Sequence, residues 1–495
     1  MNLLRHGPAA APPTLRPRGR LSLFVPRGEI LKIGIGSALT AILVAPLYWE
    51  ETLWLGAGIA LAVFVIWHGL IATKRVPWMP GFVAGIACVQ WVLAPWAAYH
   101  LPPVPTAVPL VLAPSEYFSY AVPATYALAI GLCIPLLRVG KRFTSREQGA
   151  IDLRRLPRTL DVMLVVGLFS RIVLTPFAGG GLRFVVTLIS EFAWVGGFGA
   201  MLLDAPGWRR RIIILLLIEA VAGSAQGIFY ELVVWSIYFT LLYLFARQVR
   251  RSRIIVIAAF AVFGVFTLNA IKASFREEIY GSDLSAIERG GLAVEYITGM
   301  LRDPSRVFAP DNVSFNVTRM NEGSIIGRVM YWTPSREPFA NGETIVAAVV
   351  AAFVPRALAP DKYVAGGFAN YPRFTGLALL GMTSINLSLA GEMYANYGRN
   401  GGILGMLVVG ILLGSLFALF VRWARHSVLW WAWLPFVMLT AVSAEGGVGE
   451  TLNQIVKSGL VMFAVITLVP AWEALRPKIA RRRARARAML TPRAR

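Results

Sequence analysis

The sequence predicts an all-α polytopic membrane protein with about 12 transmembrane helices and a large periplasmic segment that contains short re-entrant or interfacial helices. Three observations support this fold class. Hydrophobic residues make up 57% of the chain and charged residues only 15%, whereas soluble domains contain about 25% charged residues. The apolar residues form repeated runs close to the roughly 20 residues that a helix needs to cross a bilayer. These runs lack the apolar–polar alternation of strands in a membrane barrel.

The predicted elements follow in chain order. Residues 1–29 are rich in Pro and Arg, and we expect a disordered basic segment in the cytoplasm. The first apolar run is interpreted as a membrane helix and not as a cleaved signal, because another span follows it directly without a small-residue cleavage site. Residues 30–271 are predicted to form transmembrane helices 1–9, at 30–48, 52–72, 79–99, 117–137, 160–178, 184–203, 211–229, 231–246 and 254–271. Residues 402–474 are predicted to form helices 10–12, at 402–421, 428–443 and 454–474, before a basic cytoplasmic tail at 475–495.

The loops on one side of these spans carry the Arg and Lys residues. They are Lys74 and Arg75, the basic residues of 138–158, Arg209 to Arg211, the arginines of 247–253, Arg422, Arg425 and the tail. Cytoplasmic loops are enriched in such residues, so both termini are predicted to lie in the cytoplasm. The net charge of +22 is therefore attributed to topology and to contact with the lipid bilayer, and no nucleic acid is expected as a partner.

Residues 272–401 are predicted to lie on the periplasmic side, since the spans before and after them both place their ends there. Two parts of this segment, Thr344–Val354 and Leu377–Ala390, are apolar but short for a crossing. They are predicted to be re-entrant or interfacial helices, or a pair of short spans. A long structured loop usually carries function, so we expect the site in this segment.

Polar residues in the segment recur with helical spacing. Ser384, Ser388, Glu392 and Asn396 are four residues apart, which places them along one face of a predicted helix. Arg399 follows near the helix end, just before a Gly-Gly pair that is expected to break into the next span. The alternative to a functional site is a salt-bridged loop with a polar stripe that packs helices.

This segment resembles the O-antigen polymerase (Wzy-type) family of oligosaccharide repeat-unit polymerases. The resemblance rests on a Pro-Arg…Pro-x-Lys stretch and a following Ser…Gly-Glu-x-Tyr-x-Asn-x-Gly stretch, and it covers roughly residues 340–410. The matching residues are Pro355, Arg356, Pro360, Lys362, Ser388, Gly391, Glu392, Tyr394, Asn396, Gly398 and Gly402. The chain departs from the family at Ala359, where the family usually has Trp.

The resemblance implies an enzyme of the bacterial inner membrane that transfers a growing glycan from undecaprenyl diphosphate to a lipid-linked repeat unit. Undecaprenyl-diphosphate-linked oligosaccharides are then the substrates, for O-antigen or exopolysaccharide, and a chain-length regulator protein is an implied partner. No cofactor and no metal are expected.

The implied chemistry needs cations for the leaving diphosphate and a base for the acceptor hydroxyl. Arginine suits phosphate because its planar fork donates two parallel hydrogen bonds. Arg328, Arg356 and Lys362 are predicted to bind the diphosphate, and Arg276 is a further candidate beside Asn269 on the emerging ninth span. Glu392 is predicted to be the general base. Ser388, Tyr394, Asn396 and Arg399 are predicted to contact substrate.

Ionisable residues inside the predicted spans leave other functions open. They are Asp161, Arg171, Arg183, Glu191, Glu219 and Glu231, and such residues are functional candidates unless they pair within the bundle. A transporter or lipid-carrier flippase would use them as a proton relay. An O-antigen ligase-type transferase would rely on an outward histidine. His100 alone among the four histidines is predicted to face outward, and it lies away from the long segment, which counts against a ligase.

Overall fold

The structure is a computed structural model that describes residues 53–72, 76–104, 107–138, 156–226, 229–279, 285–354, 359, 363–364, 366–379, 384–424 and 427–469. Within these ranges the chain is helical and contains no strand. Seven helices are long and apolar enough to cross a membrane: Met79–His100, Pro114–Leu136, Arg158–Phe177, Leu182–Leu202, Ser252–Ala270, Ser388–Ala424 and Val448–Leu468. The helical membrane fold is therefore confirmed, whereas the count of about 12 spans is not.

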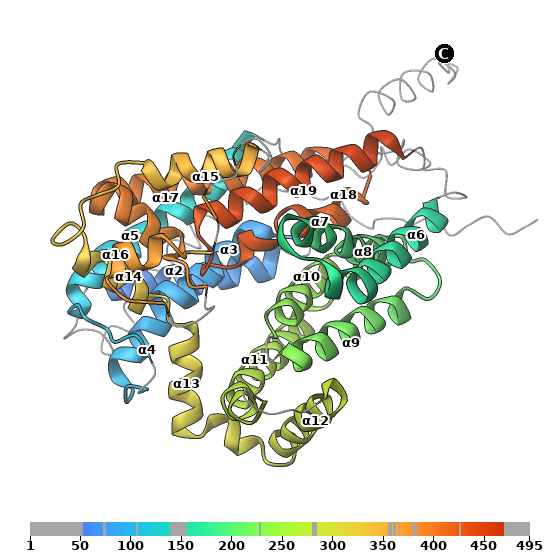
Figure 1. The fold of residues 1–495 in the computed structure, drawn as a ribbon, viewed down its shortest axis with the longest axis horizontal. Coiled ribbons are helices and arrows are strands. Elements are labelled where there is room, and N and C mark those ends of the chain that lie inside the picture. Colours follow the sequence, from blue (N-terminus) through green and yellow to red (C-terminus); the bar gives the residue numbers. More distant parts are fainter. Residues whose placement is uncertain are drawn as a thin grey trace, which may run out of the picture.

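The helices fall into two packed groups (Figure 1). The first contains α2 (Leu53–Ala72), α3 (Met79–Cys88), α4 (Ala94–His100), α5 (Pro114–Cys133), α14 (Gly323–Trp332), α15 (Glu343–Phe353), α16 (Asn370–Thr375) and α17 (Ser388–Ala424). The second contains α6 (Leu156–Phe169), α7 (Gly180–Ser190), α8 (Phe192–Leu202), α9 (Trp208–Gln226) and α10 (Tyr230–Arg247). Along one side run α11 (Arg251–Ile279), α12 (Ala286–Arg302) and α13 (Pro310–Met320), while α18 (Trp430–Val437) and α19 (Val448–Leu468) lie near the junction of the groups.

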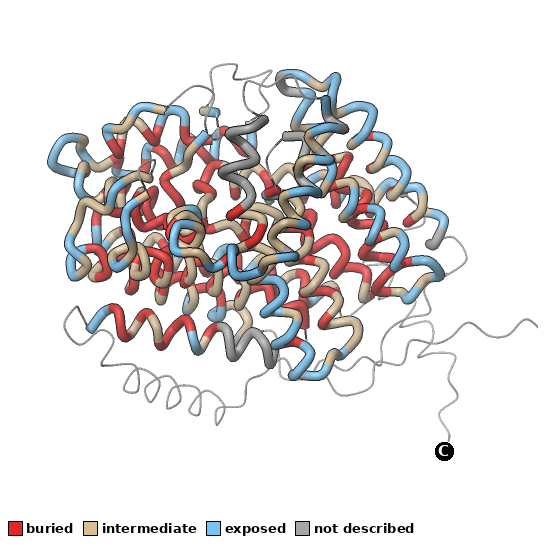
Figure 2. The backbone as a smooth tube through the Cα atoms, turned by 90° about the horizontal axis from the view of Figure 1, so that it is seen from below, coloured by how far each residue is buried: buried red, intermediate tan, exposed pale blue. Residues whose placement is uncertain are grey.

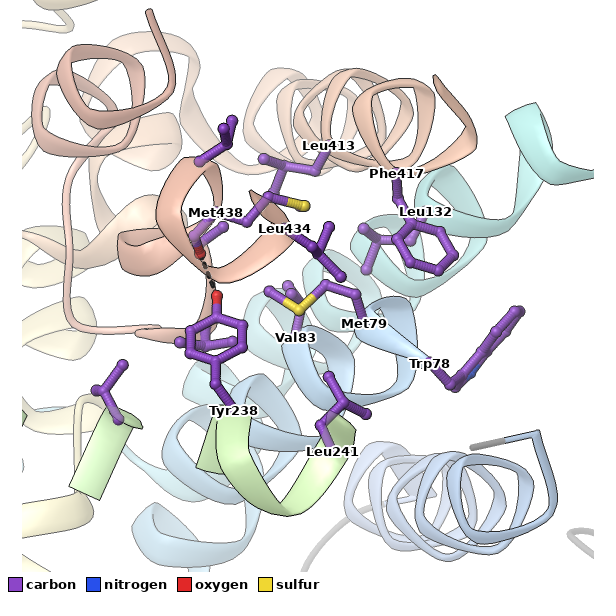
Figure 3. Packing of buried hydrophobic residues seen from close by; sticks show 14 of the residues in the cluster. Trp78, Met79, Val83, Leu132, Tyr238, Leu241, Leu413, Phe417, Leu434 and Met438 are labelled. Atoms are coloured by element: carbon purple, nitrogen blue, oxygen red, sulfur yellow. Dashed lines mark hydrogen bonds between the residues drawn. The ribbon is translucent and has the colours of Figure 1, made fainter. Parts of the chain in front are cut away.

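The short helix α18 is the centre of the core. All of its residues are buried, and it is followed by a 3₁₀ turn, η8 (Leu439–Val442). Trp433 contacts Phe192 of α8 with ring centres 6.1 Å apart, and Trp431 contacts Phe417 of α17 at 5.9 Å. Figure 3 shows Tyr238 of α10 donating a hydrogen bond to the carbonyl of Met438 beside α18. The predicted span at 428–443 is thus wrong, because Pro435 and the turn after it leave a helix too short to cross.

Glycines allow the backbones of α5 and α17 to pack closely against each other. A Cβ atom at Gly410 would lie 2.4 Å from the carbonyl oxygen of Leu128, and one at Gly131 would lie 2.4 Å from that of Leu407. Small residues bring helix backbones together in a bilayer, where burial of apolar surface does not drive association. The two helices therefore form a rigid support for whatever α17 carries at its N-terminal end.

The helix α17 turns back on itself at Gly398, whose φ of 66° and ψ of −166° are not helical. A Cβ atom at Gly405 would lie 2.6 Å from the sulfur of Met393, although 12 residues separate the two positions. Residues 388–397 consequently form a short arm beside the start of the long helix 399–424. The expected break at the Gly-Gly pair lies instead at Gly398, where the left-handed φ favours glycine.

The outward faces of the long helices are apolar, as a lipid environment requires. Figure 2 shows buried residues in the middle of the molecule and exposed ones along the outer faces. Leu404, Val408 and Leu412 of α17 are between 48% and 61% exposed and lie one turn apart. Contiguous apolar surface of this kind marks contact with a membrane or a partner.

Other predicted elements have mixed outcomes. The helix expected at Thr344–Val354 is confirmed as α15, whereas the described residues 377–379 and 384–387 of the second apolar part are not helical and α17 begins at Ser388. The spans predicted at 52–72, 211–229 and 231–246 are helices α2, α9 and α10, but none meets the length and composition of a crossing within the described ranges. The first predicted span, 1–29 and 475–495 lie outside the described residues.

Candidate functional site

A cavity of about 520 Å³ lies between α3, α10 and α11. The helices supply mostly branched aliphatic and aromatic side chains to its wall, including Ile86, Val89, Val233, Val234, Ile237, Ala261, Val265, Phe266 and Leu268. A pocket with such a wall excludes water and accepts an extended apolar group.

Six polar residues line the same cavity. They are Gln90, Tyr230, Asn269, Arg319, Ser443 and Glu445. Tyr230 begins α10, Arg319 lies in the last turn of α13, and Ser443 directly follows η8. Arg319 and Tyr230 are also exposed, so the polar side of the cavity reaches the molecular surface. The cavity is amphipathic and holds both a cation and a carboxylate.

Gln90 connects the polar groups. Its side-chain amide donates to Oε1 of Glu445 at 2.9 Å, and its backbone carbonyl accepts from the Glu322 amide at 3.1 Å. Gln90 lies in the π-helical turn η2 (Val89–Leu93) between α3 and α4, and such turns are frequent at functional sites. An irregular turn of the helix therefore positions the Gln90 amide.

Several buried oxygens near the cavity have no hydrogen-bond donor among the described residues, and two of them belong to the bonded residues Gln90 and Glu322. These two are Oε1 of Gln90, which is 9% exposed, and Oε2 of Glu322, which is 8% exposed. Burial, aided by the nearby Glu445, holds the pKa of Glu322 well above its usual range, and Arg319 opposes the shift. Unsatisfied buried acceptors are costly, and a ligand or water with donors would satisfy them.

The predicted base Glu392 lies in a different setting, a buried polar cluster between α15, α17 and α19. Its Oε1 accepts from the Thr344 hydroxyl at 3.0 Å, and its Oε2 accepts from the Val448 amide at 2.8 Å. Asn396 donates to the same Thr344 hydroxyl at 2.7 Å and accepts from the Gly342 amide at 3.0 Å. Glu392 is only 3% exposed. The cluster joins the starts of α15 and α19 to the short arm of α17.

The segment 443–448 separates the two settings. Ser443 and Glu445 line the cavity, whereas the Val448 amide bonds Glu392. A Cβ atom at Gly447 would lie 3.0 Å from Oε2 of Glu392, so a larger side chain there would require the Glu392 carboxylate to shift. Glu392 therefore binds this segment at its Val448 end, while Glu445 of the same segment lines the cavity.

Among the described side chains, Arg328 and Arg399 do not form a cation cluster around Glu392. Arg328 donates its Nε to the Thr375 carbonyl at 2.8 Å and rests over the Trp332 ring at 5.5 Å. Tyr394 packs edge-on against Tyr120 at 4.9 Å, and Arg399 is exposed. Arg276 belongs to α11, while Arg356 and Lys362 lie outside the described residues.

The predicted polar stripe is shorter than expected. Ser388, Glu392 and Asn396 lie in α17, but Ser384 precedes it and its hydroxyl donates to the Gly366 carbonyl at 2.6 Å. Ser388 itself has a φ of 60°, and its hydroxyl accepts from the Gly391 amide at 3.3 Å. The Ser388 hydroxyl caps a free amide of the first helical turn, which favours a helix start at Ser388, whereas Ser384 bonds a distant backbone carbonyl outside the helix.

The ionisable residues within the bundle are largely paired. Arg171 bonds Glu219 of α9 at 2.5 Å and also bonds Glu231 of α10. Asp161 pairs with Arg211 at 2.6 Å, and Glu191 accepts from Gln454 at 3.3 Å, whereas Arg183 is exposed. Pairing within the bundle, the alternative to a functional role, is confirmed for Arg171. In the described ranges, no three His, Cys, Asp or Glu residues gather as a metal site.

Sequence reasoning missed most of the cavity residues. The residue pattern indicates Asn269 only through its place beside Arg276, and the predicted site does not contain Gln90, Arg319 or Glu445. One usable signal was present, since Glu445 and Glu450 lie in a glycine-rich stretch between two predicted spans. The link from Gln90 to Glu445 crosses 355 residues and leaves no local pattern.

The fold and the cavity define a multi-pass α-helical membrane protein with an amphipathic pocket. No protein-family model matches the chain, and neither a curated protein nor a solved structure is similar to it.

Proposed function

We propose that this protein is a membrane glycosyltransferase that polymerises undecaprenyl-diphosphate-linked oligosaccharide repeat units into O-antigen or exopolysaccharide. The reaction would take place on the periplasmic side of the bacterial inner membrane. The observation that carries this proposal is the amphipathic cavity, because its apolar wall suits a polyprenyl chain and Arg319 offers a cation to an anionic headgroup.

The proposed topology agrees with this use of the cavity. With the N-terminus in the cytoplasm, the predicted spans put Tyr230 and Asn269, which line the cavity, at their periplasmic ends. The aliphatic wall of α10 and α11 then leads from these ends toward the bilayer interior. A lipid carrier would enter with its chain along the wall and its diphosphate at the polar side.

The resemblance over residues 340–410 supports the same reaction class. In the proposal, Arg356, Lys362, Arg328 and Arg276 help to hold the diphosphate or the glycan on the periplasmic segment 272–401. The resemblance implies Glu392 as general base, but the hydrogen bonds that both of its oxygens accept within the protein favour a structural role instead. Ser388, Tyr394, Asn396 and Arg399 stay predicted substrate contacts. A chain-length regulator stays a predicted partner.

A lipid-carrier flippase is the second candidate, because the same cavity would suit a lipid that is moved and not elongated. The two functions differ in whether a glycosidic bond forms. Purified protein in liposomes would be given lipid-linked repeat units and the products separated by size. The proposal expects a ladder of longer glycans on the carrier lipid. Transport of the carrier without elongation would favour the flippase, and transfer of glycan to an acceptor other than a repeat unit would favour a ligase.

A further inference from the structure

Glu445 is the one acid among the described residues that line the cavity, and it is half-buried there. Its Oε1 accepts from Gln90, whereas no described residue donates to its Oε2. It therefore has a fixed orientation and a free acceptor, in a cavity that would hold substrate. A general base needs both of these properties.

We propose that Glu445 is the catalytic base of this cavity, that Gln90 is its positioning residue, and that Glu392 anchors the segment carrying it. This inference rests on the proposed transferase function. In the step, the acceptor hydroxyl oxygen bonds to the anomeric carbon of the donor glycan. The bond from that carbon to the diphosphate oxygen breaks, and the lipid diphosphate leaves with the electron pair. The hydroxyl proton passes to the Glu445 carboxylate.

The proposal explains why Glu392 is unsuited to proton transfer in the folded protein. Both of its oxygens already accept hydrogen bonds, and its 3% exposure leaves no path for a sugar hydroxyl. Its contact with the Val448 amide lies at the start of α19, where a carboxylate is favourable because of the helix dipole. Glu392 thus determines where α19 begins and, through Gly447, where Glu445 lies.

Two isosteric variants separate the roles. Glu445→Gln preserves shape and removes basicity, so we expect polymerisation to fall by about 10²–10⁴-fold while binding of the lipid-linked donor is unchanged. Glu392→Gln can still accept from the Val448 amide and donate to the Thr344 hydroxyl. We expect it to polymerise within about tenfold of the wild type, as for the loss of one hydrogen bond. Both would be measured on purified protein, with donor binding as the second readout.

A second pair of variants tests whether a loss of activity at position 445 comes from misfolding. Glu445→Asp and Glu445→Asn have the same length, and only the aspartate variant is expected to polymerise measurably. Gln90→Met removes the donor to Glu445 and should lower the polymerisation rate without changing donor affinity.

The outcomes separate this assignment from the function on which it rests. If the wild type and Glu445→Gln form polymer equally well, Glu445 is not the base, but the transferase function stands. The same holds if Glu445→Gln is active and Glu392→Gln is inactive. A wild-type protein that forms no polymer would overturn the transferase and the assignment with it.

Discussion

Two buried carboxyl-bearing regions lie on opposite sides of the segment 443–448, and they differ in how well their polar groups are satisfied. Around Glu392, both carboxylate oxygens, the Thr344 hydroxyl and the Asn396 amide all have partners within the protein. Around Glu445, Oε1 of Gln90 and Oε2 of Glu322 have no donor among the described residues. Both regions are polar, but in the described part of the chain only the region around Glu445 contains buried oxygens without a hydrogen-bond donor.

The difference teaches how to separate a structural carboxylate from a functional one. A buried acceptor without a donor costs about 1–3 kcal/mol, and native proteins keep few of them. A satisfied cluster gains nothing from a ligand, whereas an incomplete one beside a cavity does. Helical spacing and the family resemblance both favour Glu392, but neither reveals whether its oxygens already have partners.

The largest expected effect tests whether the Glu392 cluster is structural. Glu392→Ala removes acceptors from the Thr344 hydroxyl and the Val448 amide, and charge-assisted bonds contribute about 1.5–3 kcal/mol each. We expect thermal unfolding in detergent to show a loss of about 3 kcal/mol, with Glu392→Gln much closer to the wild type. A Glu392→Ala protein as stable as the wild type would remove the basis of the comparison.

The next effect concerns the polar side of the cavity around Glu445. Arg319→Gln removes the cation that lines the cavity, so affinity for a lipid-linked diphosphate should fall by about 10–100-fold, the equivalent of one charge-assisted contact. The matched control is Arg336→Gln, since Arg336 is exposed over the Trp332 ring and does not line the cavity. Equal affinities for both variants and the wild type would show that the polar side does not bind the headgroup.

A smaller effect comes from the raised pKa of Glu322. The folded state holds this proton above the ordinary value of 4.5, so the stability of the wild type should fall as pH rises from that value toward the raised pKa. Glu322→Gln should remove this dependence and add about 1–2 kcal/mol at alkaline pH. Thermal unfolding across pH would measure it, with the exposed Glu116→Gln as control. Unchanged pH dependence in Glu322→Gln would mean that Glu322 is not buried as an acid.

The smallest effect sharpens the comparison with an exposed carboxylate. Glu343 forms two bonds with Arg373, at 2.9 and 3.0 Å, and these bonds lower the pKa of Glu343. The pair stabilises the fold above the ordinary pKa of this carboxyl, and the contribution is lost as pH falls through the lowered value. Glu343 is largely exposed, so Glu343→Gln should cost less than about 1 kcal/mol in thermal unfolding at neutral pH. A larger loss would show that the exposed fraction of a carboxylate does not predict its contribution to stability in this protein.

Several spans could be predicted closely because the requirement for a crossing is local. The prediction of 79–99 agrees with Met79–His100, and that of 184–203 agrees with Leu182–Leu202. The prediction failed at 428–443, where the apolar composition is right but the helix is a short core element. A buried core helix and a membrane helix have the same composition, so only packing distinguishes them.

The sequence by itself determined that the chain is a helical membrane protein, since about 20 apolar residues per crossing is a property that each run carries alone. It also located Glu392 and Asn396 on one helical face. Only the tertiary structure decided that the polar groups of this face are already hydrogen-bonded, and that buried oxygens without a donor among the described residues lie beside Glu445 instead. The cavity is built from α3, α10, α11, the end of α13 and the segment before α19, and Gln90 meets Glu445 across 355 residues. Whether a polar group is satisfied depends on neighbours that are distant in the chain, so no local pattern could reveal it.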